Sequence, residues 1–176
     1  MPLLAKLLML IFLSTPIYAK PAQIISAEAD FALRQFYSSV EGSEPFLSKV
    51  KGYLIFPSIY KGGFILGGEY GEGVLRVAGS NRGFYSFGGG SIGLQAGLQK
   101  RSLVIAFISQ RALDSFLNGN GWQAGIDGSL NIITWGSSRD LSTISFQQDA
   151  IAFVFGEAGL MGSLSLKSTK ITPIKR

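Results

Sequence analysis

Basic and aromatic side chains that could contact an anionic surface occur between residues 49 and 82. The candidates for this role are Lys49, Lys51, Tyr60, Lys61, Phe64, Arg76 and Arg82. Tyr60, Lys61 and Phe64 place a basic side chain between two aromatic rings, beside two glycines, whereas Arg76 and Arg82 are included on charge alone. Lysines mixed with aromatic rings suit an anionic membrane surface, where each basic residue contributes roughly 1 kcal/mol. An ordinary solvated basic surface is the alternative for the same composition.

Two other patterns could carry chemistry, and both have a simpler interpretation. Glu69 and Glu72 are the closest carboxylate pair in a glycine-rich segment, and Asp127 falls in a predicted strand. A glycosidase needs two carboxylates across a cleft, but charges at a solvated turn are the favoured reading. The spacing of glycines 88, 90 and 93 matches G-x-G-x-x-G. An alternating strand follows it instead of the helix that a dinucleotide site requires.

The composition excludes most enzyme classes. The 176 residues include no histidine and no cysteine, so histidine bases, thiolate nucleophiles, zinc fingers and disulfides are all absent. We therefore expect no catalytic residues, no metal and no cofactor. The formal net charge is +5, hydrophobic residues make up 47%, and 23 residues are glycine. Such a chain is too apolar to be disordered.

The first 19 residues resemble a secretory signal peptide. Lys6 supplies positive charge, residues 7–13 form a short apolar core, and Ala19 ends a cleavage site. The apolar stretch is too short to cross a bilayer core of about 30 Å as a helix. We expect cleavage after Ala19, export to the periplasm and one domain over residues 20–176. Nucleic acid is an improbable partner for an exported protein.

Periodicity predicts an α+β fold. The segments 24–40 and 44–50 have helical spacing, and a third short helix is expected at 111–117. A short strand should run from Tyr53 to Phe56 and stop at Pro57, and a hairpin should turn near residues 72–73. Further strands are expected over 84–87, 91–99, 103–108, 122–132, 150–155 and 160–166, with a turn at 80–83. We expect a mainly antiparallel, strongly curved sheet or partly closed barrel with an N-terminal helical segment.

Several motifs in a fixed order resemble the SYLF-domain family. They are Lys51 to Pro57, Lys61 to Phe64, Gly67 to Gly73, Ser91 to Gln99 with the apolar run that follows, Gly121-Trp122 with Gly125 and Asp127, and Ala158 to Gly162 with Thr169 to Ile171. The resemblance spans residues 27–174. It implies phospholipid binding, and it makes Lys51 and Lys61 the best charged candidates for a head-group contact, because both occupy motif positions.

The function expected from residues and resemblance together is non-enzymatic, peripheral binding of anionic phospholipid in the bacterial periplasm. A structural or assembly protein of the cell envelope, acting through protein contacts, is the main alternative, suggested by the Gly/Gln face of residues 91–99. A small outer-membrane barrel and a hydrolase that uses Glu69 or Asp127 are weaker alternatives. The resemblance also extends to actin-patch proteins, but we expect no appended partner-binding domain here, which argues against an actin role.

Overall fold

The computed structural model describes residues 19–63, 66–92, 99–123, 132–135, 141, 144, 146–156, 159–160, 166 and 168–176. Its helices are α2 (Ala22–Ser39), α3 (Ser43–Leu47) and α4 (Gln110–Asn118). Its strands are β1 (Gly52–Gly63), β2 (Leu66–Val77), β3 (Ser80–Ile92), β4 (Gln99–Phe107), β5 (Trp122–Gln123), β6 (Ile132–Trp135), β7 (Ala150–Gly156), β8 (Gly159–Leu160) and β9 (Thr169–Ile174). The helices at 24–40 and 111–117 are confirmed, and the second helix is shorter than expected.

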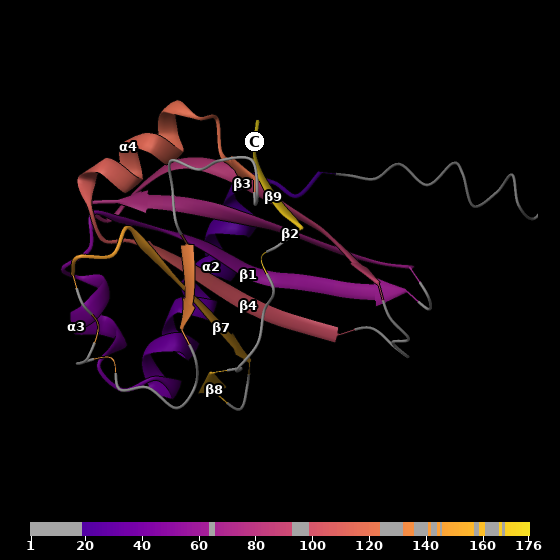
Figure 1. Cartoon of the computed structure of the whole chain (residues 1–176). Helices are drawn as coiled ribbons and strands as arrows, with labels where there is room; N and C mark the ends of the chain where they lie inside the picture. The colour runs from indigo at the N-terminus through magenta and orange to yellow at the C-terminus, as the bar shows by residue number, and fades with distance from the viewer. Residues whose placement is uncertain are drawn as a thin grey trace, which may run out of the picture.

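Within the described part of the chain, the strands form one curved sheet. Its order is β5-β9-β3-β2-β1-β4-β7-β6, with β8 also paired to β7. All neighbours are antiparallel except β6 and β7, which run parallel. The long strands β1 to β4 occupy the middle of the sheet, and β1 lies between β2 and β4 (Figure 1). The α+β class with a curved, mainly antiparallel sheet is confirmed.

Each face of the sheet packs against its own helices. On one face, the buried side chains of α4 pack with inward residues of β1, β4 and β7, and we call this the α4 face. On the opposite face, α2 and α3 cover a second buried cluster, and we call this the α2 face (Figure 1). Because both faces of β7 and of the second half of β4 are covered, residues 103–107 and 150–155 are apolar at every position. The strands expected at 103–108 and 150–155 are therefore confirmed.

The strand β1 does not stop at Pro57 as expected. Ile55 pairs with Val74 and Ser58 pairs with Glu72, so Phe56 and Pro57 together oppose a single residue of β2. This is a β-bulge, and a proline is tolerated there because the regular ladder is already interrupted. The Ser102 hydroxyl donates a hydrogen bond of 2.8 Å to the Pro57 carbonyl. The strand continues beyond the bulge to Gly63.

The hairpin turn expected near residues 72–73 is also wrong, because residues 66–77 form one uninterrupted strand. Gly62 pairs with Gly68 and Gly63 with Gly67, so the chain reverses between Gly63 and Leu66. The next reversal lies at Ala78 and Gly79, whose φ angles are +50° and +76°, and not at 80–83. Two consecutive residues with positive φ suit a tight turn between antiparallel strands.

Parts of three other predictions fall outside the described residues. The strand expected at 91–99 is described only at its ends, where β3 finishes and β4 begins. The strand expected at 122–132 is described at its first two residues and its last. Only β8 and Leu166 represent the segment 160–166. Within the described ranges, no helix is both long and apolar enough to cross a membrane.

The bulge predicts that β2 requires a glycine at position 73. A Cβ added at Gly73 would lie 2.3 Å from the Ile55 carbonyl oxygen, whereas one added at Gly68 meets nothing within 4 Å. Gly73→Ala should therefore lower the free energy of unfolding by roughly 1–3 kcal/mol through overpacking against backbone. Gly68→Ala, in the same strand, is the matched control and should change it far less. Urea denaturation measures both, and equal midpoints for the two variants would contradict this account of the bulge.

Candidate functional site

The predicted site residues divide between the two ends of the sheet. Lys49 and Lys51 are exposed where α3 leads into β1, and Arg82 is exposed near the start of β3. Tyr60 and Lys61 lie near the other end of β1, about 30 Å away at roughly 3.3 Å per residue. The structure therefore does not bring Lys49 and Lys51 together with Lys61. Phe64 lies outside the described residues.

Arg76 has a structural role in this fold. Its guanidinium forms a 2.7 Å ion pair with Asp30 of α2, and its side chain is only 12% exposed. Its Nε also donates a 3.1 Å hydrogen bond to the side-chain oxygen of Asn81. These contacts join α2 to the β2–β3 hairpin. Arg76 is thus already occupied by protein groups, unlike the exposed lysines near the same end of the sheet.

A row of exposed aromatic and basic side chains crosses the α2 face beyond the helices. Tyr60 pairs with both Tyr70 and Lys100, and Gly88 pairs with both Tyr70 and Lys170. The order along the row is therefore Lys170, Gly88, Tyr70, Tyr60 and Lys100, which we call the tyrosine–lysine row. The two rings are 53% and 40% exposed for Tyr70 and Tyr60. Four strand spacings of about 4.8 Å separate the two lysines, or about 19 Å.

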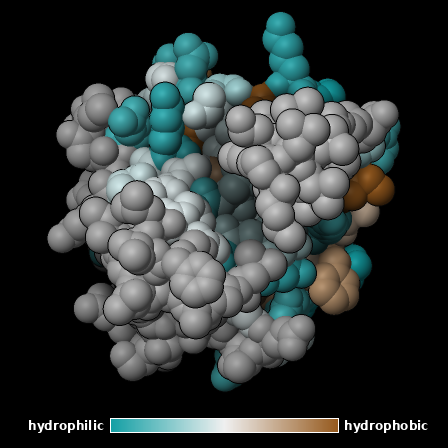
Figure 2. Space-filling model, turned by 90° about the vertical axis from the view of Figure 1, so that its right-hand side faces the viewer, coloured by the Kyte–Doolittle hydropathy of each residue, from teal (hydrophilic) through white to brown (hydrophobic). Residues whose placement is uncertain are grey.

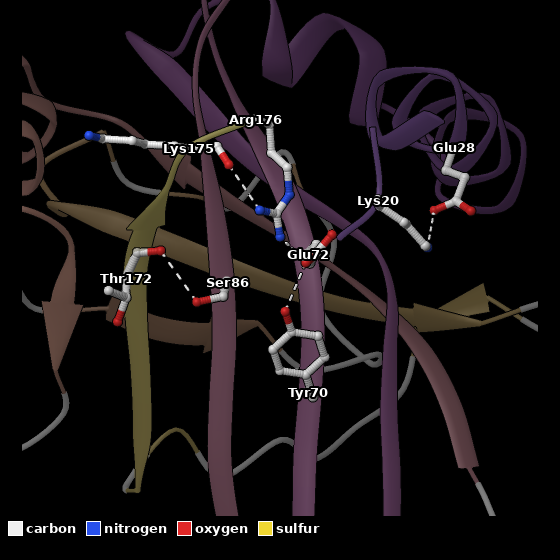
Figure 3. A network of polar contacts seen from close by, with 8 residues as sticks. All are labelled: Lys20, Glu28, Tyr70, Glu72, Ser86, Thr172, Lys175 and Arg176. Carbon is white, nitrogen blue, oxygen red and sulfur yellow. Dashed lines mark hydrogen bonds and ion pairs between the residues drawn. The ribbon is translucent and has the colours of Figure 1, made fainter. Parts of the chain in front are cut away.

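The neighbouring carboxylate does not neutralise this row. Glu72 lies two residues beyond Tyr70 in β2, on the same face, and is ion-paired to Arg176. The Tyr70 hydroxyl donates a 2.8 Å hydrogen bond to Glu72, so the carboxylate lies between a ring and a guanidinium (Figure 3). Lys100 and Lys170 have no ion pair with any described residue. Because Arg176 compensates Glu72, the two lysines keep their full charge for a ligand.

Lys61 points to the opposite face. It is 3.6 Å from Glu69 of β2, and the same carboxylate is 2.5 Å from the guanidinium of Arg101 on β4. We call these three residues the inner ion cluster, because their side chains are only 10–15% exposed. They lie on the α4 face, where β1 ends and β4 begins. Figure 2 looks at that end of the molecule, where hydrophilic atoms are visible.

The two glutamates do not form a facing pair. Glu69 belongs to the inner ion cluster, whereas Glu72 is on the α2 face, because three residues along a strand reverse the side-chain direction. Neither carboxylate is at a solvated turn as expected, since both side chains are at most 10% exposed. Asp127 lies outside the described residues. Among the described residues, no group of three potential ligands could hold a metal ion.

The glycine motif at 88–90 serves a sheet and not a phosphate loop. Gly88 and Gly90 are inside β3, and no described helix begins there. Gly88 leaves backbone exposed in the middle of the tyrosine–lysine row, since an added Cβ would meet only one atom, at 3.9 Å. A nucleotide-binding turn is therefore excluded at these two residues.

Sequence reasoning missed Tyr70, Lys100 and Lys170 in the row, and Arg101 in the cluster. Finding them required the strand register, because they come from three strands, β2, β4 and β9. One signal was present in the sequence: the glycine pairs 62–63 and 67–68 are symmetric about residue 65. A hairpin centred there places Tyr60 opposite Tyr70. The partners Lys100 and Lys170 had no comparable signal.

One protein family matches the chain. The sequence model of the Ysc84 family, described as a Las17-binding protein actin regulator, matches residues 88–176, a little over half of the chain. The chain belongs to this family, and the SYLF-domain resemblance of its motifs is confirmed. The family is associated with lipid and actin-related binding. A search of curated proteins finds none that matches the chain.

Glu72 should control the titration of Tyr70. Partial burial raises the pKa of Tyr70 above its ordinary value of 10.0, and the hydrogen bond to Glu72 and the carboxylate charge raise it further. Glu72→Gln removes the charge and should lower this pKa, but burial should keep it above 10. An NMR titration of ¹³C-labelled tyrosine rings measures the change, and Glu44→Gln is the control. An unchanged Tyr70 pKa in Glu72→Gln would contradict the contact.

Proposed function

We propose that the protein binds anionic phospholipid surfaces peripherally and without catalysing a reaction. The observation that carries this proposal is the tyrosine–lysine row, in which two half-exposed rings lie between two uncompensated lysines. Tyrosine rings favour the interface between hydrocarbon and water, and lysine ammonium groups favour phosphate. Membership of a family associated with lipid binding supports the same function.

The expected electrostatic contribution of the row is modest and measurable. Two lysines near an anionic surface contribute about 2 kcal/mol together, or roughly a 30-fold change in affinity. The rings lie between the lysines in one line, so all four side chains can meet a locally flat surface at once. Because the lysines are exposed and act through long-range attraction, binding should weaken as salt increases.

The proposal places this surface in the bacterial periplasm, because the first 19 residues resemble a signal peptide. Expression of the whole chain in a Gram-negative bacterium, followed by cell fractionation and intact-mass measurement, tests the location. The expected product is periplasmic and begins at Lys20. A chain that keeps residues 1–19 in the cytoplasm would overturn this part of the proposal and leave lipid binding unaffected.

Binding through protein contacts is the second candidate. It is favoured by the description of the family, which names a protein-binding actin regulator. For this chain the candidate becomes a structural or assembly role in the cell envelope. Multi-angle light scattering during size-exclusion chromatography distinguishes it, since self-assembly predicts a mass above one chain and peripheral lipid binding alone does not.

Vesicle co-sedimentation tests the row. The wild-type mature chain should bind vesicles of phosphatidylcholine with phosphatidylglycerol more tightly than vesicles of phosphatidylcholine alone. Lys100→Gln/Lys170→Gln should weaken binding to the anionic vesicles by roughly 30-fold, because both charges of the row are lost. Lys49→Gln/Lys51→Gln changes the net charge equally at the other end of the sheet, and it should have a smaller effect.

The outcomes separate the site from the function. Weaker binding only in Lys49→Gln/Lys51→Gln would move the lipid surface to the start of β1, where Lys51 was the candidate from the motifs. Equal losses in both double variants would mean a diffuse basic surface with no particular site. Failure of the wild-type chain to bind either vesicle would overturn the lipid function and leave the protein-contact candidate.

A further inference from the structure

The inner ion cluster has more positive than negative charge in a poorly exposed place. Lys61 and Arg101 share one carboxylate, that of Glu69, and the three side chains are 15%, 11% and 10% exposed. They come from three adjacent strands, since β1 lies between β2 and β4. No other described carboxylate pairs with either cation. The cluster therefore has a net charge of +1.

Two of the three guanidinium nitrogens of Arg101 have no hydrogen-bond partner. Its Nη2 is ion-paired with Glu69, at 2.5 Å from a carboxylate oxygen. Both Nε and Nη2 are buried and lack a hydrogen-bond partner. A guanidinium has five N–H donors in a planar fork that matches carboxylate and phosphate oxygens. Leaving buried donors unpaired destabilises the folded protein, most strongly where the donors are charged.

A glycine of β3 lies beside the cluster. Gly89 of β3 pairs with Glu69, and a Cβ added there would lie 3.7 Å or more from its neighbours, among them the Glu69 side chain. The cluster is thus beside bare backbone.

We infer that Lys61 and Arg101 form a binding site for one phosphate-type oxyanion, and that Glu69 is their counter-ion when the site is empty. A bound oxyanion accepts hydrogen bonds from the unpaired nitrogens of Arg101 and balances the excess positive charge. The same group can come from free phosphate or from the head group of a phospholipid. This site is independent of the tyrosine–lysine row, because it lies on the opposite face of the sheet.

Isothermal titration calorimetry on the mature chain tests the site with two probes. They are inorganic phosphate and dihexanoylphosphatidic acid below its micelle concentration, both at fixed ionic strength in chloride. Arg101→Met should weaken binding by roughly tenfold or more, as for the loss of a charge-assisted hydrogen bond. Arg82→Met, which removes an exposed arginine at the other end of the sheet, should bind like the wild type.

The Glu69→Gln variant distinguishes a ligand-binding site from an ion pair that has a structural role only. It removes the carboxylate that competes with the ligand, so phosphate-type anions should bind more tightly than to the wild type. Without phosphate, the melting temperature should fall, because two buried cations lose their counter-ion. Added phosphate should restore more of the melting temperature than an equal ionic strength of chloride.

Each outcome decides the inference. Tighter binding by Glu69→Gln together with weaker binding by Arg101→Met supports it, and the preferred probe identifies free phosphate or a lipid head group as the source. No binding of either probe by the wild type and Glu69→Gln overturns it, as does wild-type affinity in Arg101→Met. If Arg101→Met does not fold, Glu69→Gln still decides. Vesicle sedimentation through the row should be unchanged in Arg101→Met, so the two proposals fail separately.

Discussion

The bulge at Pro57 determines which side chains of β1 face which layer of the molecule. Before the bulge, Leu54 and Phe56 lie on the α4 face, and after it Ile59 takes the same face. In a regular strand, Tyr60 would lie on the same face of the sheet as Phe56, and Lys61 would lie on the opposite face. The extra residue instead sends Tyr60 to the exposed end of the α2 face and Lys61 to the inner ion cluster. Both candidate sites depend on this one shift in the ladder.

The neighbouring strands are built to accept the bulge. Gly73 lies where the Ile55 carbonyl approaches too closely for any side chain, and Ser102 satisfies the carbonyl of Pro57 from the other side. Part of the glycine content of the chain therefore serves close backbone contact in the centre of the sheet. Elsewhere the same residue type has a different effect, since Gly88 leaves backbone bare in the tyrosine–lysine row.

Ion pairs decide which charges remain for a ligand. Arg76 is taken up by Asp30, and Glu72 by Arg176, so neither contributes net charge to a binding surface. Lys100 and Lys170 have no such partner among the described residues. The seven residues predicted from composition and motif position could not be sorted in this way, because pairing depends on distance in space. Only Tyr60 and Lys61 of that group entered the two sites described above.

The sequence by itself determined the fold class, the long first helix, the helix after β4 and the two strands buried on both faces. These are local signals, since helical spacing and unbroken apolar runs reflect the environment of a single segment. It also identified the family through motifs in order. Only the tertiary structure decided the hairpin positions, the faces of Tyr60 and Lys61, and their partners Tyr70, Lys100 and Arg101. Strand register is a contact between distant segments, and a shift of one residue reverses every side chain.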